Sequence, residues 1–221
     1  TGQGAKPSGW DAAAAGAGAL VQADAVFDGD RMRPGAVLRV EGGQAHFHDG
    51  PVADLPLWRA KGTLAPGFVD LQVNGGGGVL FNTSPTPEGL LAIARAHRST
   101  GTAAFLPTLI TDTPKVMTAA AHAILPVLGQ QGIVGLHLEG PHISPVRRGT
   151  HAAVYVRPLD AHTLAIAADL RAKDVPLMLT LAPEAVQPGQ IAQLVGQGVI
   201  VALGHSDADA DLVQAALTEG A

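Results

Sequence analysis

Five apolar runs, each followed by a segment with helix signals, occupy the chain from residue 64 onward. We predict strands at 68–74, 103–109, 133–139, 177–181 and 199–205. Strands that alternate with helices are typical of βαβ units, in which the strands run parallel and helices cover the sheet. This alternation restricts the chain to an α/β fold built on a parallel sheet.

The segments between these strands begin with recognisable N-terminal helix signals. Proline in the first turn, behind a capping hydroxyl or carboxylate, is a common way to start a helix. A serine followed three residues later by an acid has the spacing of a capping box. The signals are Thr86 with Pro87, Thr113 with Pro114, Asp160 alone, and Ser206 with Asp209.

Polar side chains gather at the carboxyl end of the predicted sheet. Alternation turns Gln72 and Asn74 to one face of the first strand, and it turns His137 and Glu139 to one face of the third. Chemistry in a (β/α)8 barrel takes place at this end of the strands. We therefore predict an α/β fold with a TIM-type (β/α)8 barrel and keep an open, doubly wound sheet as the alternative.

An acid and an imidazole end two of these strands. Glu139 ends the third strand before a Gly-Pro pair, and His205 ends the fifth, where alternation groups it with Val201 and Leu203. Carboxylate and imidazole are both ligands of zinc and iron, so the pair predicts a divalent-metal site. Two alternatives stay open. Glu139 could be a structural carboxylate bonded to loop amides, and His205 could be a core histidine that caps the next helix.

The sequence before residue 64 has a different pattern, of short strand-like runs separated by turn residues. Three apolar runs, at 20–27, 36–40 and 45–48, alternate with Asp-Gly and Gly-Gly turns. This pattern predicts a small β meander. Residues 1–18 are rich in glycine and alanine and are expected to form a flexible tail.

Composition excludes several classes of partner. The net charge is −5 and no run of Lys or Arg exceeds Arg147-Arg148, which argues against nucleic acid. No apolar stretch reaches the roughly 18 residues of a membrane span, so no membrane association is expected. The 221 residues include no cysteine, which excludes disulfides and thiolate metal sites and is compatible with a cytoplasmic location.

Several motifs in order carry a family resemblance. They are APGFVDLQVNGGGGVLFN at 65–82, FLPTLIT at 105–111, GLHLEGPHISPVRRGTH at 135–151, TLAPE at 180–184 and LGHS at 203–206. Together they resemble the N-acetylglucosamine-6-phosphate deacetylases of the amidohydrolase superfamily. The resemblance implies a metal-dependent barrel over 64–221, part of a small β-sandwich over 19–63, and removal of acetate from an amino-sugar phosphate.

The resemblance also implies roles for single residues. Glu139 and His205 match the family's metal ligands, while Thr150 and His151 match a pair that contacts substrate. Many amidohydrolases begin with His-x-His on the first strand and bind a second metal there, whereas this chain has Gln72 and Asn74. We therefore expect one divalent ion, zinc first, with iron or another divalent ion as the alternative.

The family's remaining catalytic residues have no counterpart in these 221 residues. A further histidine ligand and a catalytic aspartate are expected beyond residue 221, so we expect a longer protein and an inactive, aggregation-prone chain when these residues are expressed alone. His137 is expected to support Glu139 through a hydrogen bond, and His142 is a possible pocket residue.

Alternatives remain for substrate and role. The chain could act on another N-acyl or cyclic amide substrate, or it could be a non-catalytic barrel fragment. For the complete protein we expect a homodimer in the cytoplasm.

Overall fold

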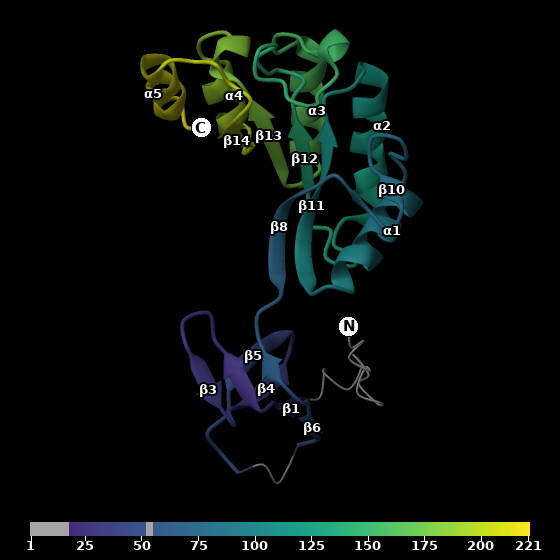
Figure 1. The fold of residues 1–221 in the computed structure, drawn as a ribbon, viewed down its shortest axis with the longest axis vertical. Coiled ribbons are helices and arrows are strands. Elements are labelled where there is room, and N and C mark those ends of the chain that lie inside the picture. Colours follow the sequence, from purple (N-terminus) through teal and green to yellow (C-terminus); the bar gives the residue numbers. More distant parts are fainter. Residues whose placement is uncertain (1–17, 52–54) are drawn as a thin grey trace. The chain divides into compact units, whose positions relative to one another are not determined.

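The structure, a computed structural model, describes residues 18–51 and 55–221 (Figure 1). The chain divides between Pro66 and Gly67 into two compact units. Most of the predicted tail at 1–18 lies outside the described residues. Among the helices that are described, none combines the length and apolar character needed to cross a bilayer.

The N-terminal unit holds two small sheets. One has the strand order β5-β4-β1-β6 and the other β3-β2-β7. The predicted meander is wrong here, because the first apolar run breaks at Ala23 and Asp24 and its two halves join different sheets. Asp24 fixes this break, since its Oδ2 accepts the Gly62 N–H at 2.7 Å and its backbone oxygen accepts the Gly35 N–H at 3.0 Å. The strands are β1 Ala19–Gln22, β2 Ala25–Phe27, β3 Met32–Pro34, β4 Val37–Glu41, β5 Gln44–Phe47, β6 Leu57–Arg59 and β7 Thr63–Leu64.

The second unit is built on five parallel strands in the order β14-β13-β12-β11-β8. Figure 1 shows them side by side. Every neighbour in the sheet is also the next of these strands along the chain. A doubly wound sheet reverses its order at a switch point, so this order excludes that alternative and fits part of a barrel. The strands are β8 Phe68–Val73, β11 Thr102–Ile110, β12 Leu136–Glu139, β13 Leu177–Leu181 and β14 Ile200–Leu203, and a hairpin of β9 Gly75–Gly76 and β10 Val79–Leu80 follows β8.

The helices begin where the sequence signals place them, with one exception. The side chains of Thr86, Thr113 and Asp160 cap α1 Pro87–Arg98, α2 Pro114–Ile124 and α3 Ala161–Ala172, as predicted. The capping box at Ser206 is wrong, because Asp209 is itself the N-cap of α5 Ala210–Thr218. The remaining helices are α4 Gln190–Gly196 and short 3-10 turns at Leu125–Val127, Ala153–Tyr155 and Pro183–Ala185.

The core lies between the sheet and its helices. Leu136 and Leu138 of β12 are almost fully buried there, and Leu179 and Val201 on the neighbouring strands belong to the same cluster. Period-two alternation then puts Glu139 on the other face, level with Thr180 of β13 and Ala202 of β14. The grouping of His205 with Val201 and Leu203 was wrong. Those two side chains pack on the core, and His205 lies beyond the strand.

Candidate metal centre

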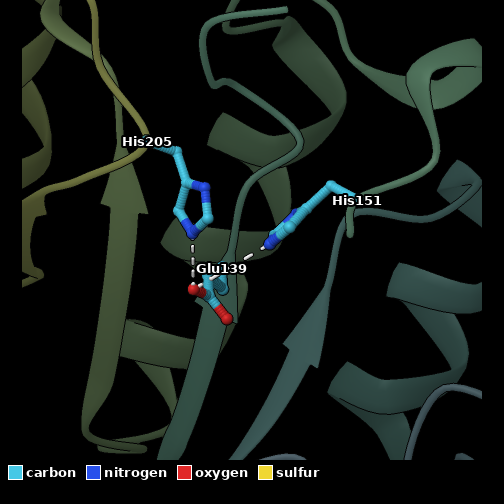
Figure 2. A group of neighbouring side chains, drawn as sticks. All are labelled: Glu139, His151 and His205. Atoms are coloured by element: carbon cyan, nitrogen blue, oxygen red, sulfur yellow. Dashed lines mark hydrogen bonds and ion pairs between the residues drawn. The ribbon is translucent and has the colours of Figure 1, made fainter. Parts of the chain in front are cut away.

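Glu139 is the last residue of β12, and its side chain is only 9% exposed. Its Oε2 accepts a hydrogen bond from Gln72 Nε2 at 2.8 Å. Its Oε1 lies 3.0 Å from His205 Nε2 and 3.9 Å from His151 Nε2 (Figure 2). The two oxygens therefore have different neighbours: one is held by an amide, and the other faces two imidazoles.

His205 reaches Glu139 through an unusual backbone conformation. Its φ is +52°, in the left-handed region that residues other than glycine adopt uncommonly. Its Nδ1 lies 2.9 Å from the Arg147 carbonyl oxygen, which can only accept, so Nδ1 carries the proton. In the neutral ring the lone pair is then on Nε2, directed at a carboxylate oxygen. Two such electron-rich atoms at 3.0 Å need a positive charge between them, either a second ring proton or a metal ion.

His151 enters the same place from the loop after β12. Its Nδ1 lies 2.7 Å from Thr111 Oγ1, and its ring centroid is 4.5 Å from that of His205, with the two planes tilted by 53°. Burial lowers the pKa of His151, and the neighbouring His205 lowers it further, although the Glu139 charge acts to raise it. The ring is therefore neutral at neutral pH, which is the form that binds metals and accepts hydrogen bonds.

The ligand-type atoms of Glu139, His151 and His205 lie within 4.8 Å of one another. One carboxylate and two imidazoles are a common donor set for zinc or iron. Local sequence patterns paired Glu139 with His205, whereas His151 was expected at the site only through the family resemblance, as a substrate contact. The returning path of the loop that carries it has no local sequence signal.

Gln72 and Asn74, which stand where many amidohydrolases have histidines, have separate partners. Gln72 binds Glu139 as described, and Asn74 Nδ2 donates to the Thr108 carbonyl at 3.4 Å. The Gln72 amide nitrogen thus holds the Glu139 oxygen that does not face the imidazoles.

His137 lies one inward position below Glu139, between two threonines. The Thr108 hydroxyl donates to the Leu106 carbonyl, so it accepts from His137 Nδ1 at 3.1 Å. His137 Nε2 then accepts from the Thr180 hydroxyl at 2.8 Å. Burial lowers the pKa of His137, in agreement with a neutral ring. No hydrogen bond from His137 to Glu139 is among the described contacts; the ring bonds Thr108 and Thr180 and so joins β11, β12 and β13 beneath Glu139.

His142 is fully buried but turns to the helices. Its Nδ1 lies 3.1 Å from the Arg157 carbonyl oxygen, and its Nε2 lies 2.8 Å from Thr163 Oγ1 on α3. Burial lowers the pKa of His142 as well. Both ring nitrogens are engaged by the protein, so His142 is not part of the group around Glu139.

The loop residues next to His151 have mixed surroundings. Thr150 is exposed. Arg147 forms an ion pair with Asp207, with Nε 2.7 Å from Oδ1, and Arg148 Nη1 donates to the His151 carbonyl at 2.9 Å. Both arginines therefore bind the protein around the site and help to fix the loops.

Backbone hydrogen bonds continue the sheet beyond its strands and hold the loops together. The Gly140 N–H donates to the Thr180 carbonyl at 2.9 Å, and the Gly204 N–H donates to the Leu181 carbonyl at 3.0 Å. Further out, the Ser144 N–H donates to the His205 carbonyl at 2.9 Å. These bonds join the ends of three consecutive strands at the edge that carries the site.

Comparison with known proteins finds similar sequences among deacetylases of amino-sugar phosphates. An N-acetylgalactosamine-6-phosphate deacetylase of a Shewanella strain is 47% identical over 174 residues, covering 76% of this chain and 43% of that protein. The mouse N-acetylglucosamine-6-phosphate deacetylase is 36% identical over 201 residues, covering 86% of this chain and 48% of that protein. No family model matches the chain.

A solved structure gives the same result. The N-acetylglucosamine-6-phosphate deacetylase from Pasteurella multocida superimposes with a TM-score of 0.81 at 31% identity, covering 92% of this chain and 55% of that chain. This likeness confirms the predicted amidohydrolase-type barrel, of which the present chain contributes five parallel strands. The chain spans about half the length of the curated relatives that it matches, and over that span it is similar to N-acetylgalactosamine- and N-acetylglucosamine-6-phosphate deacetylases.

Proposed function

We propose that the complete protein hydrolyses the N-acetyl group of an N-acetylhexosamine 6-phosphate. Water adds to the amide carbonyl, the C–N bond breaks, and the products are acetate and the amino-sugar phosphate. The observation that carries this proposal is the convergence of Glu139, His151 and His205 at the carboxyl edge of a barrel-type sheet. This is the edge at which such folds place their chemistry.

Glu139 and His205 are the proposed metal ligands, for one divalent ion with zinc first and iron second. The donor set fits such an ion, because His205 Nε2 and a carboxylate oxygen of Glu139 already face one another at 3.0 Å. When bound, the ion would supply charge that lowers the pKa of water and polarises the amide carbonyl. Gln72 keeps Glu139 oriented by occupying its other oxygen.

His151 and the exposed Thr150 are the proposed substrate contacts. His151 lies farther from Glu139 than His205 does, at 3.9 Å against 3.0 Å, and its Nδ1 is held by Thr111. Its Nε2 can therefore hydrogen-bond a group of the sugar or its acetamide beside the metal ligands. The acid that protonates the leaving amine is expected from the part of the relatives' length that this chain does not span.

The identity of the sugar has two candidates. N-acetylglucosamine 6-phosphate is the first, because the mouse and Pasteurella relatives carry that name. N-acetylgalactosamine 6-phosphate is the second, because the relative with 47% identity is named for it. The two differ in the orientation of one hydroxyl group, and a site built to hydrogen-bond that group can discriminate strongly between them.

The test is acetate release by the complete protein from both 6-phosphates and from unphosphorylated N-acetylglucosamine. We expect turnover of at least one 6-phosphate at a kcat/KM far above that of the neutral sugar, because the phosphate anchors the substrate. Equal turnover of phosphorylated and unphosphorylated sugars, or activity on neither while another N-acyl or cyclic amide is cleaved, would reject the proposal.

The oligomeric state and the cellular location of the complete protein are a separate proposal. We propose a cytoplasmic homodimer that takes a small amino-sugar phosphate and needs neither nucleic acid nor membrane. Light scattering coupled to size-exclusion chromatography of the complete protein tests the dimer directly.

A further inference from the structure

Glu184 binds the loop that carries His205. It lies in the 3-10 turn Pro183–Ala185, directly after β13. Its Oε1 accepts the Asp207 backbone N–H at 2.6 Å, and its Oε2 accepts the Ser206 hydroxyl at 2.8 Å. Both donors directly follow His205 in the chain. One carboxylate thus fixes the two residues next to a proposed metal ligand.

His205 needs such support because of its backbone. A residue other than glycine with φ of +52° is held in a sparsely populated conformation, which persists only where the surroundings impose it. On one side the His205 carbonyl accepts the Ser144 N–H, and Nδ1 donates to the Arg147 carbonyl. On the C-terminal side, the bonds to Glu184 hold the chain.

The same carboxylate also connects the two loops that meet at His205. The Ser144 side chain, on the loop after β12, also acts on Glu184 and helps to lower its pKa. Arg147 of that loop pairs with Asp207, with its Nε 2.7 Å from Oδ1. Burial acts to raise the pKa of Glu184, but the hydrogen bonds from Asp207, Ser206 and Ser144 lower it below its usual value. Glu184 is therefore ionised at neutral pH and can hold all these donors together.

We propose that Glu184 is a positioning residue for the metal centre. By fixing residues 206–207 it keeps His205 in the strained conformation that directs Nε2 at Glu139. The inference rests on the proposed function, since it requires a metal bound by Glu139 and His205. It assigns a role to the acid of the TLAPE motif, which has no described hydrogen bond to Glu139, His205 or His151.

The experiment is a zinc titration of the complete protein in competition with a chromophoric chelator, a readout independent of turnover. Loss of an outer hydrogen-bonding partner of a metal site typically costs about 10–100-fold in affinity. We expect Glu184→Ala to weaken zinc binding by about tenfold, at the low end of this range because the carboxylate is solvent-exposed. Glu184→Gln should stay within about threefold of wild type, since its amide oxygen can still accept the Asp207 N–H and its amide group can donate to the Ser206 oxygen.

Glu219 provides a matched control. It is a second glutamate that accepts backbone N–H groups far away in the sequence, from Gly189 at 2.9 Å and Ala192 at 3.2 Å, but it has no described contact with the His205 loop. Glu219→Ala should lower the stability of the metal-free protein about as much as Glu184→Ala does. It should leave the zinc affinity unchanged.

The outcomes separate the two proposals. If wild-type protein binds zinc and Glu184→Ala binds it equally well, the role of Glu184 is refuted and the proposed function stands. If both alanine variants lose affinity in proportion to their stability, Glu184 is a structural residue and the inference fails. If wild-type protein binds neither zinc nor iron in this titration, the proposed function fails and this inference fails with it.

Discussion

The loop after β12 carries two buried histidines, and their ring nitrogens differ in how many are bound by the protein. His142 has both ring nitrogens bound to protein groups, the Arg157 carbonyl and the Thr163 hydroxyl. His151 has one nitrogen on Thr111 and presents the other to Glu139. Burial lowers the pKa of both. Burial and a perturbed pKa therefore do not distinguish a functional histidine from a structural one here; the distinction comes from which nitrogens remain available.

The largest effect on the proposed metal centre is expected from Glu139→Gln. Among the described residues, Glu139 alone presents a carboxylate to His205 and His151, and an amide cannot replace its negative charge. Zinc affinity of the complete protein should fall by more than about 100-fold, beyond the range typical of outer partners. Equilibrium dialysis followed by elemental analysis measures this. Full retention of one zinc ion per chain would place the metal elsewhere.

Alanine variants of the two histidines should have different effects, one on stability and the other on activity. His142→Ala leaves the buried Thr163 hydroxyl and Arg157 carbonyl without a partner and opens a cavity, so it should reduce the free energy of unfolding by about 3 kcal/mol. His151→Ala should lower kcat/KM for the 6-phosphate by about 10–100-fold through a lost substrate hydrogen bond, while zinc is retained. Urea unfolding and acetate assays give the two readouts.

The exposed His122 on α2 serves as a control for both variants, because its replacement by alanine should change stability by less than about 0.5 kcal/mol and leave activity intact. A His142→Ala protein that is as stable as wild type would show that its two hydrogen bonds contribute nothing. Loss of zinc in His151→Ala would make His151 a metal ligand and correct its proposed role.

Much of this arrangement follows from the sequence. The five strands, the three side-chain caps and the position of Glu139 follow from local patterns, since alternation and capping depend on near neighbours. The pairing of Glu139 with His205 was predicted as well, but the backbone conformation of His205 and the path to His151 were not. His205 leaves the alternation through a positive φ, and the path to His151 depends on hydrogen bonds between loops, such as Ser144 to His205, that connect distant residues. The division of the first apolar run between two sheets was missed for the same reason.

Gln72→Ala should have a smaller effect on the metal than Glu139→Gln. Gln72 donates one hydrogen bond to the Glu139 oxygen that does not face the histidines. Its removal frees the carboxylate to rotate but leaves its charge in place, so zinc should be retained with a loss of affinity below about tenfold. The chelator titration measures this. A loss as large as that of Glu139→Gln would mean that the amide is a ligand itself.

The smallest effect is expected on stability, from replacement of Asp160. This residue caps α3, the helix whose Thr163 bonds His142. Burial acts to raise the pKa of Asp160, but the Arg157 guanidinium and the Thr163 N–H outweigh it and lower the pKa to about 2. A carboxyl with a folded pKa below its unfolded value of 3.8 stabilises the fold above about pH 4, and this contribution disappears as the pH falls toward 2. Asp160→Asn keeps a capping oxygen but loses the charge, so it should cost about 1 kcal/mol at neutral pH and flatten the acid dependence of stability between pH 4 and 2. Zinc affinity should not change, because Asp160 has no described contact with Glu139 or His205. Urea unfolding across that pH range measures the acid dependence of stability. An Asp160→Asn variant that lost zinc affinity but kept the acid dependence of wild type would show that the surroundings of His142 influence the metal centre.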